Sequence, residues 1–246
     1  MPPTVRLRGN APRRRGPYPL GEIPRSVILA IGRKIVHRLA VGMDDVTGDD
    51  FAGIFASAVG GNHRSSPLGV ADVELNGCAW SIKTVKSSTP FTQRVVRLIS
   101  GRNSPVFSQH INNPLANVQI TGNAILKIWN ARVDEALAEY DDLRVFVMLR
   151  NLKTRQFLVT EHAAILYQPR DYVWTLNNNE NLVGLHRDTG VHQFTWQPHG
   201  SQFTVHHHIP ASAQGFKIVR LPAVLSEQEL MTAIGFDDSW IETVEL

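Results

Sequence analysis

One stretch of the sequence decides the fold, and it reads Gly69-Val-Ala-Asp-Val-Glu-Leu-Asn-Gly-Cys-Ala-Trp-Ser-Ile-Lys-Thr-Val-Lys86. Apolar and polar residues alternate on both sides of the dipeptide Asn76-Gly77. Asn-Gly accepts the positive φ angles that a tight hairpin turn requires. The stretch therefore predicts two antiparallel strands joined at this dipeptide.

The polar residues of this hairpin are spaced so that they meet on one side. Successive side chains of a strand point to opposite faces, so Asp72 and Glu74 share a face of the first strand. Ser81 and Lys83 share a face of the second strand for the same reason. A carboxylate beside an ammonium group suits hydrolysis of a phosphodiester, because the carboxylate binds a divalent cation and the lysine stabilises negative charge. The alternative is an ordinary hairpin whose polar residues face water.

Residues 72–83 resemble the active-site hairpin of the PD-(D/E)XK nucleases, and of type II restriction endonucleases above all. In that family an Asp on one strand is followed, on the next, by an acidic residue, any residue and Lys. Asp72 and Lys83 match the first and last positions. Ala71 stands where the motif has Pro, and Ser81 stands where Asp or Glu is usual.

The resemblance implies a Mg²⁺-dependent endonuclease that cuts double-stranded DNA at a specific sequence. It assigns Asp72 and the Ile82 backbone carbonyl to the metal, and Lys83 to the attacking water or the charged transition state. Some restriction enzymes are similar in having Ser at the position of Ser81, with an acidic side chain from elsewhere completing the metal site. Glu74 and Asp50 are the candidates for that carboxylate.

The same resemblance implies a homodimer, because a palindromic site calls for two-fold symmetry. Two other functions stay open. One is a nuclease of repair or recombination that recognises DNA structure rather than sequence. The other is a DNA-binding protein that kept the fold and lost cleavage, which Ser81 in place of an acidic residue allows.

The composition is that of a globular protein with room for a core. The chain has 246 residues, 43% of them hydrophobic, and a formal net charge of +3. The single cysteine, Cys78, excludes an internal disulfide and a cysteine-rich zinc site. No apolar run approaches the roughly 20 residues of a membrane span, so we expect no membrane association and a cytoplasmic location.

The N-terminal residues 1–20 form a basic arm with five arginines in a Pro- and Gly-containing context. Such an arm either follows DNA phosphates or remains a solvated tail. We expect residues 21–246 to form a single nuclease domain. Its catalytic core spans 21–160, and 161–246 is a β-rich extension for DNA recognition or a plain antiparallel sheet.

Helical periodicity precedes the hairpin. Apolar residues recur at helical spacing over residues 24–40 and again from residue 47 or 48 to Gly60. Thr47 and Asp50 have the spacing of a capping box, which is the alternative to a metal role for Asp50. The polar loop 62–67 leads into the hairpin and supplies His63 and Arg64 as candidate DNA contacts.

After the hairpin, Thr89-Pro90 predicts the start of a helix that ends at Gly101. Arg94, Arg97 and Arg102 would then give this helix a basic, DNA-facing side. Residues 101–113 read as a loop.

The longest helical pattern covers residues 114–140, where Gly122 lies on the buried stripe and permits close packing. The run 145–149 is continuously apolar, as in a strand covered on both faces, and 157–160 forms a strand after a turn. The expected strands and the last helix are 172–176, 192–196, 202–205, 216–220 and 226–234. His206 and His208 share a strand face, but no second ligand cluster accompanies them. The predicted fold is α/β, with a mixed central sheet flanked by helices, a restriction-endonuclease-like core and a β-rich C-terminal extension.

Overall fold

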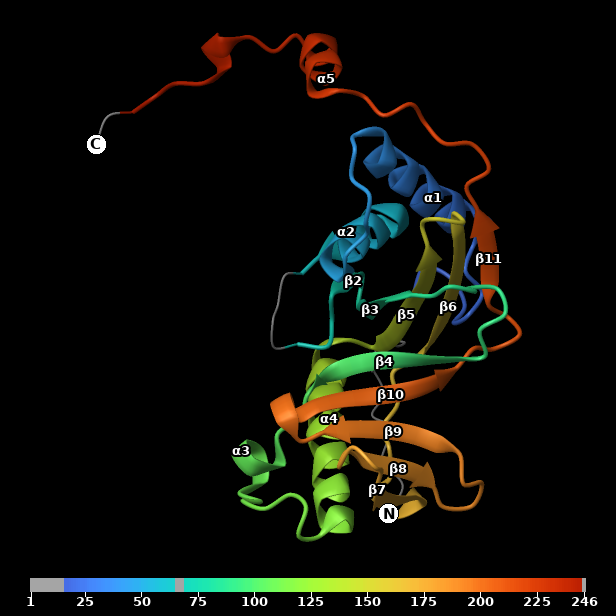
Figure 1. Cartoon of the computed structure of the whole chain (residues 1–246), viewed down its shortest axis with the longest axis vertical. Helices are drawn as coiled ribbons and strands as arrows, with labels where there is room; N and C mark the ends of the chain where they lie inside the picture. Colours follow the sequence, from blue (N-terminus) through green and yellow to red (C-terminus); the bar gives the residue numbers. More distant parts are fainter. Residues whose placement is uncertain (1–15, 65–68, 245–246) are drawn as a thin grey trace, which may run out of the picture.

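The computed structural model describes residues 16–64 and 69–244, and two β-sheets form the centre of this part of the chain (Figure 1). One sheet is mixed, the other is antiparallel, and helices flank both. The predicted α/β class, with a mixed sheet flanked by helices, is therefore confirmed. Arg6, Arg8, Arg13, Arg14 and Arg15 of the basic arm lie outside the described residues, as do residues 65–67 of the loop before the hairpin.

The mixed sheet carries the hairpin. From edge to edge its strands are β1 (Asn62–His63), β2 (Val73–Leu75), β3 (Cys78–Lys86), β5 (Asp142–Asn151), β6 (Gln156–Ala163) and β11 (Gln214–Lys217). Only the central pair β3 and β5 is parallel among these described strands. The predicted apolar run 145–149 lies in β5 and is buried throughout, because β5 has a neighbour on each side and cover on each face.

The antiparallel sheet lies beside it. Its order is β4 (Val95–Arg102), β10 (Gln202–His208), β9 (His192–Gln197), β8 (Leu182–His186) and β7 (Tyr172–Leu176). Short 3₁₀ turns at Pro169–Asp171 and His199–Ser201 precede β7 and β10.

Two helices cover one face of the mixed sheet. They are α1 (Arg25–Ala40) and α2 (Gly48–Val59), both as expected from the periodicity. Phe55 of α2 lies between Trp80 and Phe146, with ring centroids 5.4 and 4.3 Å away. Ile31 and Ile35 of α1 join the same buried cluster. Because Trp80 faces these helices, Ser81 and Lys83 point to the opposite face of β3.

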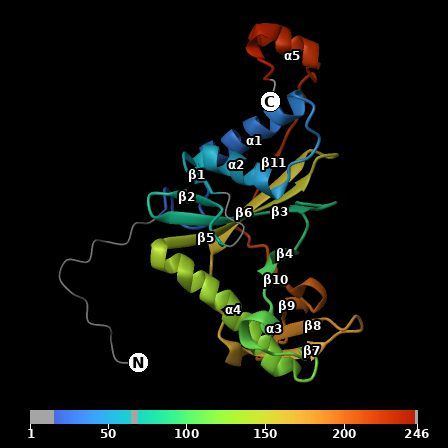
Figure 2. The same ribbon diagram turned by 90° about the vertical axis from the view of Figure 1, so that its left-hand side faces the viewer.

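Helix α4 (Val118–Glu139) connects the two sheets on the opposite side (Figure 2). Its residues Ile125, Trp129 and Val133 share one buried cluster with Ala79 of β3 and Phe194 of β9. Asn117 caps its N-terminus, so the helix begins four residues later than the expected residue 114. Beside it, the short helix α3 (Pro105–Gln109) lies in the segment that was expected to be a loop.

The predicted helix after Thr89-Pro90 is wrong. Thr89 accepts hydrogen bonds from Thr92 and Gln93, which closes a single turn, and the chain then continues as β4. Val96 and Leu98 are buried while the residues between and after them are exposed, which is the two-residue period of a strand. Pairing with β10 stabilises this strand, so a tertiary contact overrides a correct local helix-start signal.

The two sheets do not divide the chain at residue 160. Strand β4, from the first half, pairs with β10 in the antiparallel sheet. Strand β11, from the second half, pairs with β6 in the mixed sheet. Each sheet therefore needs strands from both sides of the expected boundary between core and extension.

The C-terminal residues form α5 (Glu227–Ile234) and a 3₁₀ turn at Asp238–Trp240. Ser226 caps α5 and Gly235 ends it, as the sequence predicts. No helix within residues 16–64 and 69–244 combines the length and the apolar character needed to cross a bilayer.

Candidate active site

The predicted hairpin is confirmed, and its register places the polar residues together. Asn76 and Gly77 have φ angles of 50° and 83°, which form the turn between β2 and β3. Glu74 lies opposite Ala79, and the Asp72 amide donates to the Trp80 carbonyl at 2.8 Å. Asp72 therefore continues the pairing beyond β2, at the level of Ser81.

The Asp72 carboxylate is the centre of this group. Its Oδ2 accepts a hydrogen bond from the Ile82 amide at 2.6 Å. The same oxygen lies 3.5 Å from Ser81 Oγ and 4.0 Å from Lys83 Nζ. Both charged side chains keep over a quarter of their surface exposed, at 30% for Asp72 and 27% for Lys83. The carboxylate and ammonium groups thus lie on the same side of the sheet and are accessible to solvent.

The Ile82 carbonyl points toward the same edge of β3 as the Ile82 amide, which is the edge that faces Asp72. The N–H and C=O of one strand residue point to the same edge, as the paired bonds of an antiparallel ladder require. Because the Ile82 N–H faces Asp72 beyond the end of β2, the Ile82 carbonyl opens there too. Asp72 Oδ1 accepts no hydrogen bond from any residue that the structure describes, so this oxygen and the Ile82 carbonyl oxygen are the two candidate cation ligands here.

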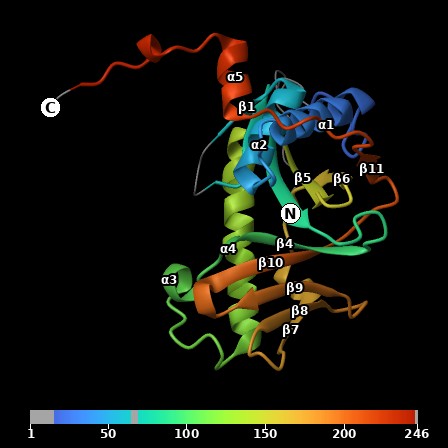
Figure 3. The ribbon, with the colours of Figure 1, turned by 45° about the horizontal axis from the view of Figure 1, so that its top comes forward.

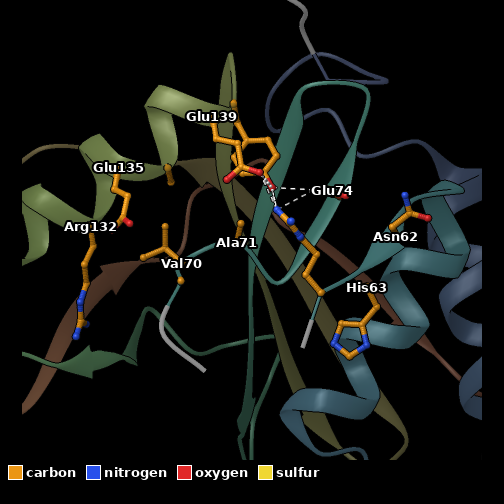
Figure 4. Close-up of a pocket in the computed structure, with 12 residues that line it drawn as sticks. Asn62, His63, Val70, Ala71, Glu74, Arg132, Glu135 and Glu139 are labelled. Carbon is orange, nitrogen blue, oxygen red and sulfur yellow. Dashed lines mark hydrogen bonds and ion pairs between the residues drawn. The ribbon is translucent and has the colours of Figure 1, made fainter. Parts of the chain in front are cut away.

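A cleft of about 760 Å³ lies next to the hairpin, between its base and the C-terminal half of α4 (Figure 4). Its walls carry both carboxylates and basic groups, from Asn62, His63, Arg64, Gly69, Val70, Ala71, Glu74, Arg132, Glu135, Ala136, Glu139 and Tyr140. Ala71 and Glu74, on either side of Asp72 in the chain, both line it. The cleft therefore adjoins the segment that carries Asp72, although the Asp72 side chain is not among its lining residues.

Glu74 and Arg64 are held together inside this cleft. The Tyr140 hydroxyl donates to Glu74 Oε2 at 2.7 Å, and Arg64 Nη1 lies 3.2 Å from the same oxygen. Arg64 also pairs with Glu139 at 2.8 Å, which lowers the pKa of that carboxyl. Both residues thus have protein partners, and their expected metal and DNA roles stay predictions.

Asp50 caps its own helix. Its carboxylate accepts from the Thr47 amide at 2.9 Å and pairs with Arg38 at 2.9 Å. These contacts lower its pKa, with the Thr47 backbone hydrogen bond as the largest cause. The capping box is confirmed, and a metal role for Asp50 is not supported by any contact with the hairpin in the described residues. His63 pairs with the neighbouring Asp49 at 3.3 Å.

Arg94, Arg97 and Arg102 are exposed on or beside β4, an edge strand, rather than on a helix. Arg97 alternates with Val96 and Leu98, so it points away from the side of β4 that carries Leu98. Leu98 lines a second, small cavity with Ser81 and Lys83. Arg97 therefore lies on the outer face of the antiparallel sheet, not on the face of the Asp72–Lys83 pair.

The small cavity between the two sheets was not expected from the sequence. It has a volume of about 20 Å³, enough for roughly one water molecule. His162 lines it, opposite Val145 in the register, and its ring stacks on that of His207 at 3.8 Å. Burial lowers the pKa of His162 to about 3 and that of His207 to about 4, so both rings are neutral at pH 7. The strand register brings these histidines together at the junction of the two sheets. This register could not be predicted from the spacing of residues in the sequence.

No family model, curated protein or solved structure matches this chain. Within the described ranges, no three His, Cys, Asp or Glu side chains are grouped so as to hold a metal ion. What the site can do therefore follows from its own atoms: one carboxylate, one backbone carbonyl, one hydroxyl and one ammonium group where β3 extends beyond the end of β2. The Asp72 and Lys83 side chains are partly exposed there, and Ser81 is buried.

Proposed function

We propose that this chain is a magnesium-dependent endonuclease that hydrolyses phosphodiester bonds of double-stranded DNA at a specific sequence. The observation that supports it most is the 4.0 Å separation of Asp72 Oδ2 and Lys83 Nζ, with Ser81 Oγ 3.5 Å from the same oxygen. This is the pairing that the resemblance to PD-(D/E)XK nucleases requires at the hairpin. The order of α2, the hairpin, α4 and the buried strand β5 agrees with a restriction-endonuclease-like core.

The donor set fits Mg²⁺. This ion prefers oxygen ligands, keeps several waters and is usually held by one or two carboxylates together with substrate phosphate. Asp72 and the Ile82 carbonyl would hold it, with Ser81 contributing a hydroxyl contact. When bound, the ion polarises the phosphate and lowers the pKa of a coordinated water.

Lys83 contributes a positive charge that needs no metal. Its ammonium group lies on the sheet face of Asp72 and Ser81, over the small cavity with His162. A fixed cation at this place stabilises the negative charge that develops on a phosphate as its bond to oxygen breaks. The Asp72 carboxylate, with Oδ2 4.0 Å from the ammonium nitrogen, orients the lysine.

The cleft beside the hairpin is where we expect the DNA backbone to enter. His63 and Arg64 line it. Arg94, Arg97 and Arg102 lie on or beside β4, outside this cleft, and would contact DNA only where it extends beyond the cleft. A homodimer would present two such sites to a palindromic sequence.

Lys83→Ala tests the assignment. The variant should bind DNA and cut it at least about 100-fold more slowly, because a fixed transition-state charge is lost. The measurements are plasmid digestion with Mg²⁺ and a gel-shift assay without it. Lys86→Ala is the matched control: Lys86 is on the same strand, is paired with Asp45 at 2.8 Å, and should leave cutting unchanged. Cutting by Lys83→Ala at the wild-type rate would remove the lysine from the mechanism.

A second candidate, a DNA-binding protein without cleavage, is favoured by Ser81 standing where a carboxylate is usual. The wild-type digest separates the possibilities. Discrete bands support a sequence-specific nuclease, nicks confined to branched or damaged DNA support a structure-specific one, and retained binding without cutting supports the second candidate.

A further inference from the structure

The C-terminal residues 219–244, which we call the C-terminal arm, leave the body of the chain at the end of α1. The Leu225 amide donates to the Ala40 carbonyl at 2.8 Å. Beyond this bond, no hydrogen bond or ion pair joins residues 226–244 to the rest of the described chain. The arm projects past α1 and away from both sheets (Figures 1 and 3).

The arm is folded locally but has no buried face. Ser226 and Glu229 form a reciprocal capping box, and Phe236 packs against Trp240 at 5.6 Å. Yet no residue of α5 is buried, and large apolar side chains are exposed at Val219, Leu221, Val224, Leu225, Ile234, Trp240, Ile241 and Val244. An eight-residue helix is marginal alone in water, so its apolar side chains call for a covering surface.

The charge of the arm is opposite to that of the body. Residues 219–244 contain five acidic residues and one basic residue, whereas residues 1–218 contain 16 acidic and 24 basic residues. Helix α1 contains four of those basic residues and no acidic one. Its outer side carries Arg25, Leu29, Arg33 and His37 at four-residue steps, and Leu29 is 61% exposed. An acidic, apolar arm and a basic stripe with an apolar centre are complementary.

We propose that the C-terminal arm docks on the outer side of α1 in a second copy of this chain, and that the exchange is reciprocal. Docking on its own α1 is opposed by the Leu225–Ala40 bond, because Ser226 alone links this fixed point to the first residue of α5. A helix that follows its anchor so closely has no loop with which to reverse direction.

Size and symmetry support the exchange. A standard interface takes about 20–30 residues from each partner. The arm and the outer side of α1 together offer a similar number of residues in each copy. Because each copy gives an arm and receives one, the contact is two-fold symmetric and closes as a dimer. The inference does not depend on the chemistry at Asp72, so failure of the nuclease proposal leaves it standing.

The test is a charge swap in the full chain, followed by molar mass from light scattering during gel filtration. Wild type should have twice the mass of the 27.4 kDa chain. Arg25→Glu with Arg33→Glu on the stripe, or Glu227→Arg with Glu242→Arg on the arm, should raise the dimer dissociation constant at least about tenfold. All four changes in one chain should restore the dimer.

The matched control is Glu180→Arg with Asp188→Arg, two exposed acidic residues of the antiparallel sheet's loops, which should leave the dimer intact. A monomeric wild type, or a dimer that survives both charge reversals and Leu29→Asp, would overturn the proposal. Failure of the four-change chain to dimerise, while its circular dichroism stays that of wild type, would overturn it as well.

Discussion

Arg144 and Glu161 show what single residues contribute beneath the site. Their side chains are 2% and 0% exposed and form an ion pair at 3.1 Å. Glu161 also accepts from Trp80 Nε1 at 2.7 Å and from the Tyr18 hydroxyl at 3.0 Å. Burial, together with the Glu161 charge, raises the pKa of Tyr18, so its hydroxyl stays a donor. This network ties residues before α1 to the strand that carries Ser81.

Arg144→Ala should therefore destabilise the fold by about 3–5 kcal/mol, because it leaves the Glu161 carboxylate buried without a counter-charge. Urea unfolding at pH 7 measures the loss. Arg170→Ala is the control, since Arg170 is 86% exposed and its pair with Asp171 should contribute within about 1 kcal/mol. Equal effects of the two changes would contradict a structural role for the buried pair.

The part of the candidate site that could be predicted from the sequence is the part whose geometry depends on a single local turn. Asn76-Gly77 fixes the hairpin register, and the register brings Asp72, Ser81 and Lys83 together. The Glu74–Tyr140 hydrogen bond joins residues 66 positions apart, and no spacing in the sequence encodes it. The same holds for His162, which reaches the small cavity through pairing of β5 with β6.

At the scale of elements, helices were predictable from periodicity and caps, because those signals lie within each helix. Helices α1, α2, α4 and α5 are present where the patterns predict them, apart from a few end residues. Residues 95–102 were not predictable in the same way. Their local sequence begins with a genuine turn at Thr89, and their pairing partner β10 lies about 100 residues further along the chain.

Gly122 marks a close approach of α4 to the antiparallel sheet. A Cβ at this position would lie 2.1 Å from Cδ2 of Trp174, whose ring is buried. Gly122→Ala should cost about 1–3 kcal/mol through overpacking, even though alanine favours a helix. Thermal or urea unfolding measures the change.

Gly53→Ala in α2 is the matched control, because nothing lies within 4 Å of a Cβ there. It should be neutral or stabilising by up to about 1 kcal/mol. If Gly122→Ala were as stable as Gly53→Ala, the close contact between α4 and Trp174 would be wrong.

At the scale of the whole molecule, the two sheets share one interior. Val96 and Leu98 of the antiparallel sheet pack on Val145 and Val147 of the mixed sheet. The His162–His207 stack lies on the same junction, with one ring from each sheet. The junction is therefore sensitive to the charge of these rings.

This sensitivity predicts a pH dependence of stability. The folded-state pKa values, about 3 for His162 and about 4 for His207, lie below the ordinary value of 6.5. The unfolded chain therefore takes up protons first as the pH falls. Above about pH 6.5 these two rings are neutral in both states and do not lower the free energy of unfolding. That free energy decreases as the pH falls from about 6.5 toward 4.

His162→Phe keeps an aromatic ring on His207 and removes one titrating group. The variant should lose less stability than wild type between about pH 7.5 and about pH 5 in urea unfolding, because other histidines titrate equally in both. An identical loss in the two proteins would exclude His162 from the pH response.

The pairing of β4 with β10 also has a consequence for biosynthesis. A ribosome adds about 5–20 residues per second, so the roughly 100 residues between these strands take about 5–20 s to appear. During that interval a nascent chain holds Val95, Val96, Leu98 and Ile99 with no sheet neighbour. Newly made copies on one messenger are then exposed to mutual aggregation at this segment, and we expect co-expression of a holdase chaperone to raise the soluble yield.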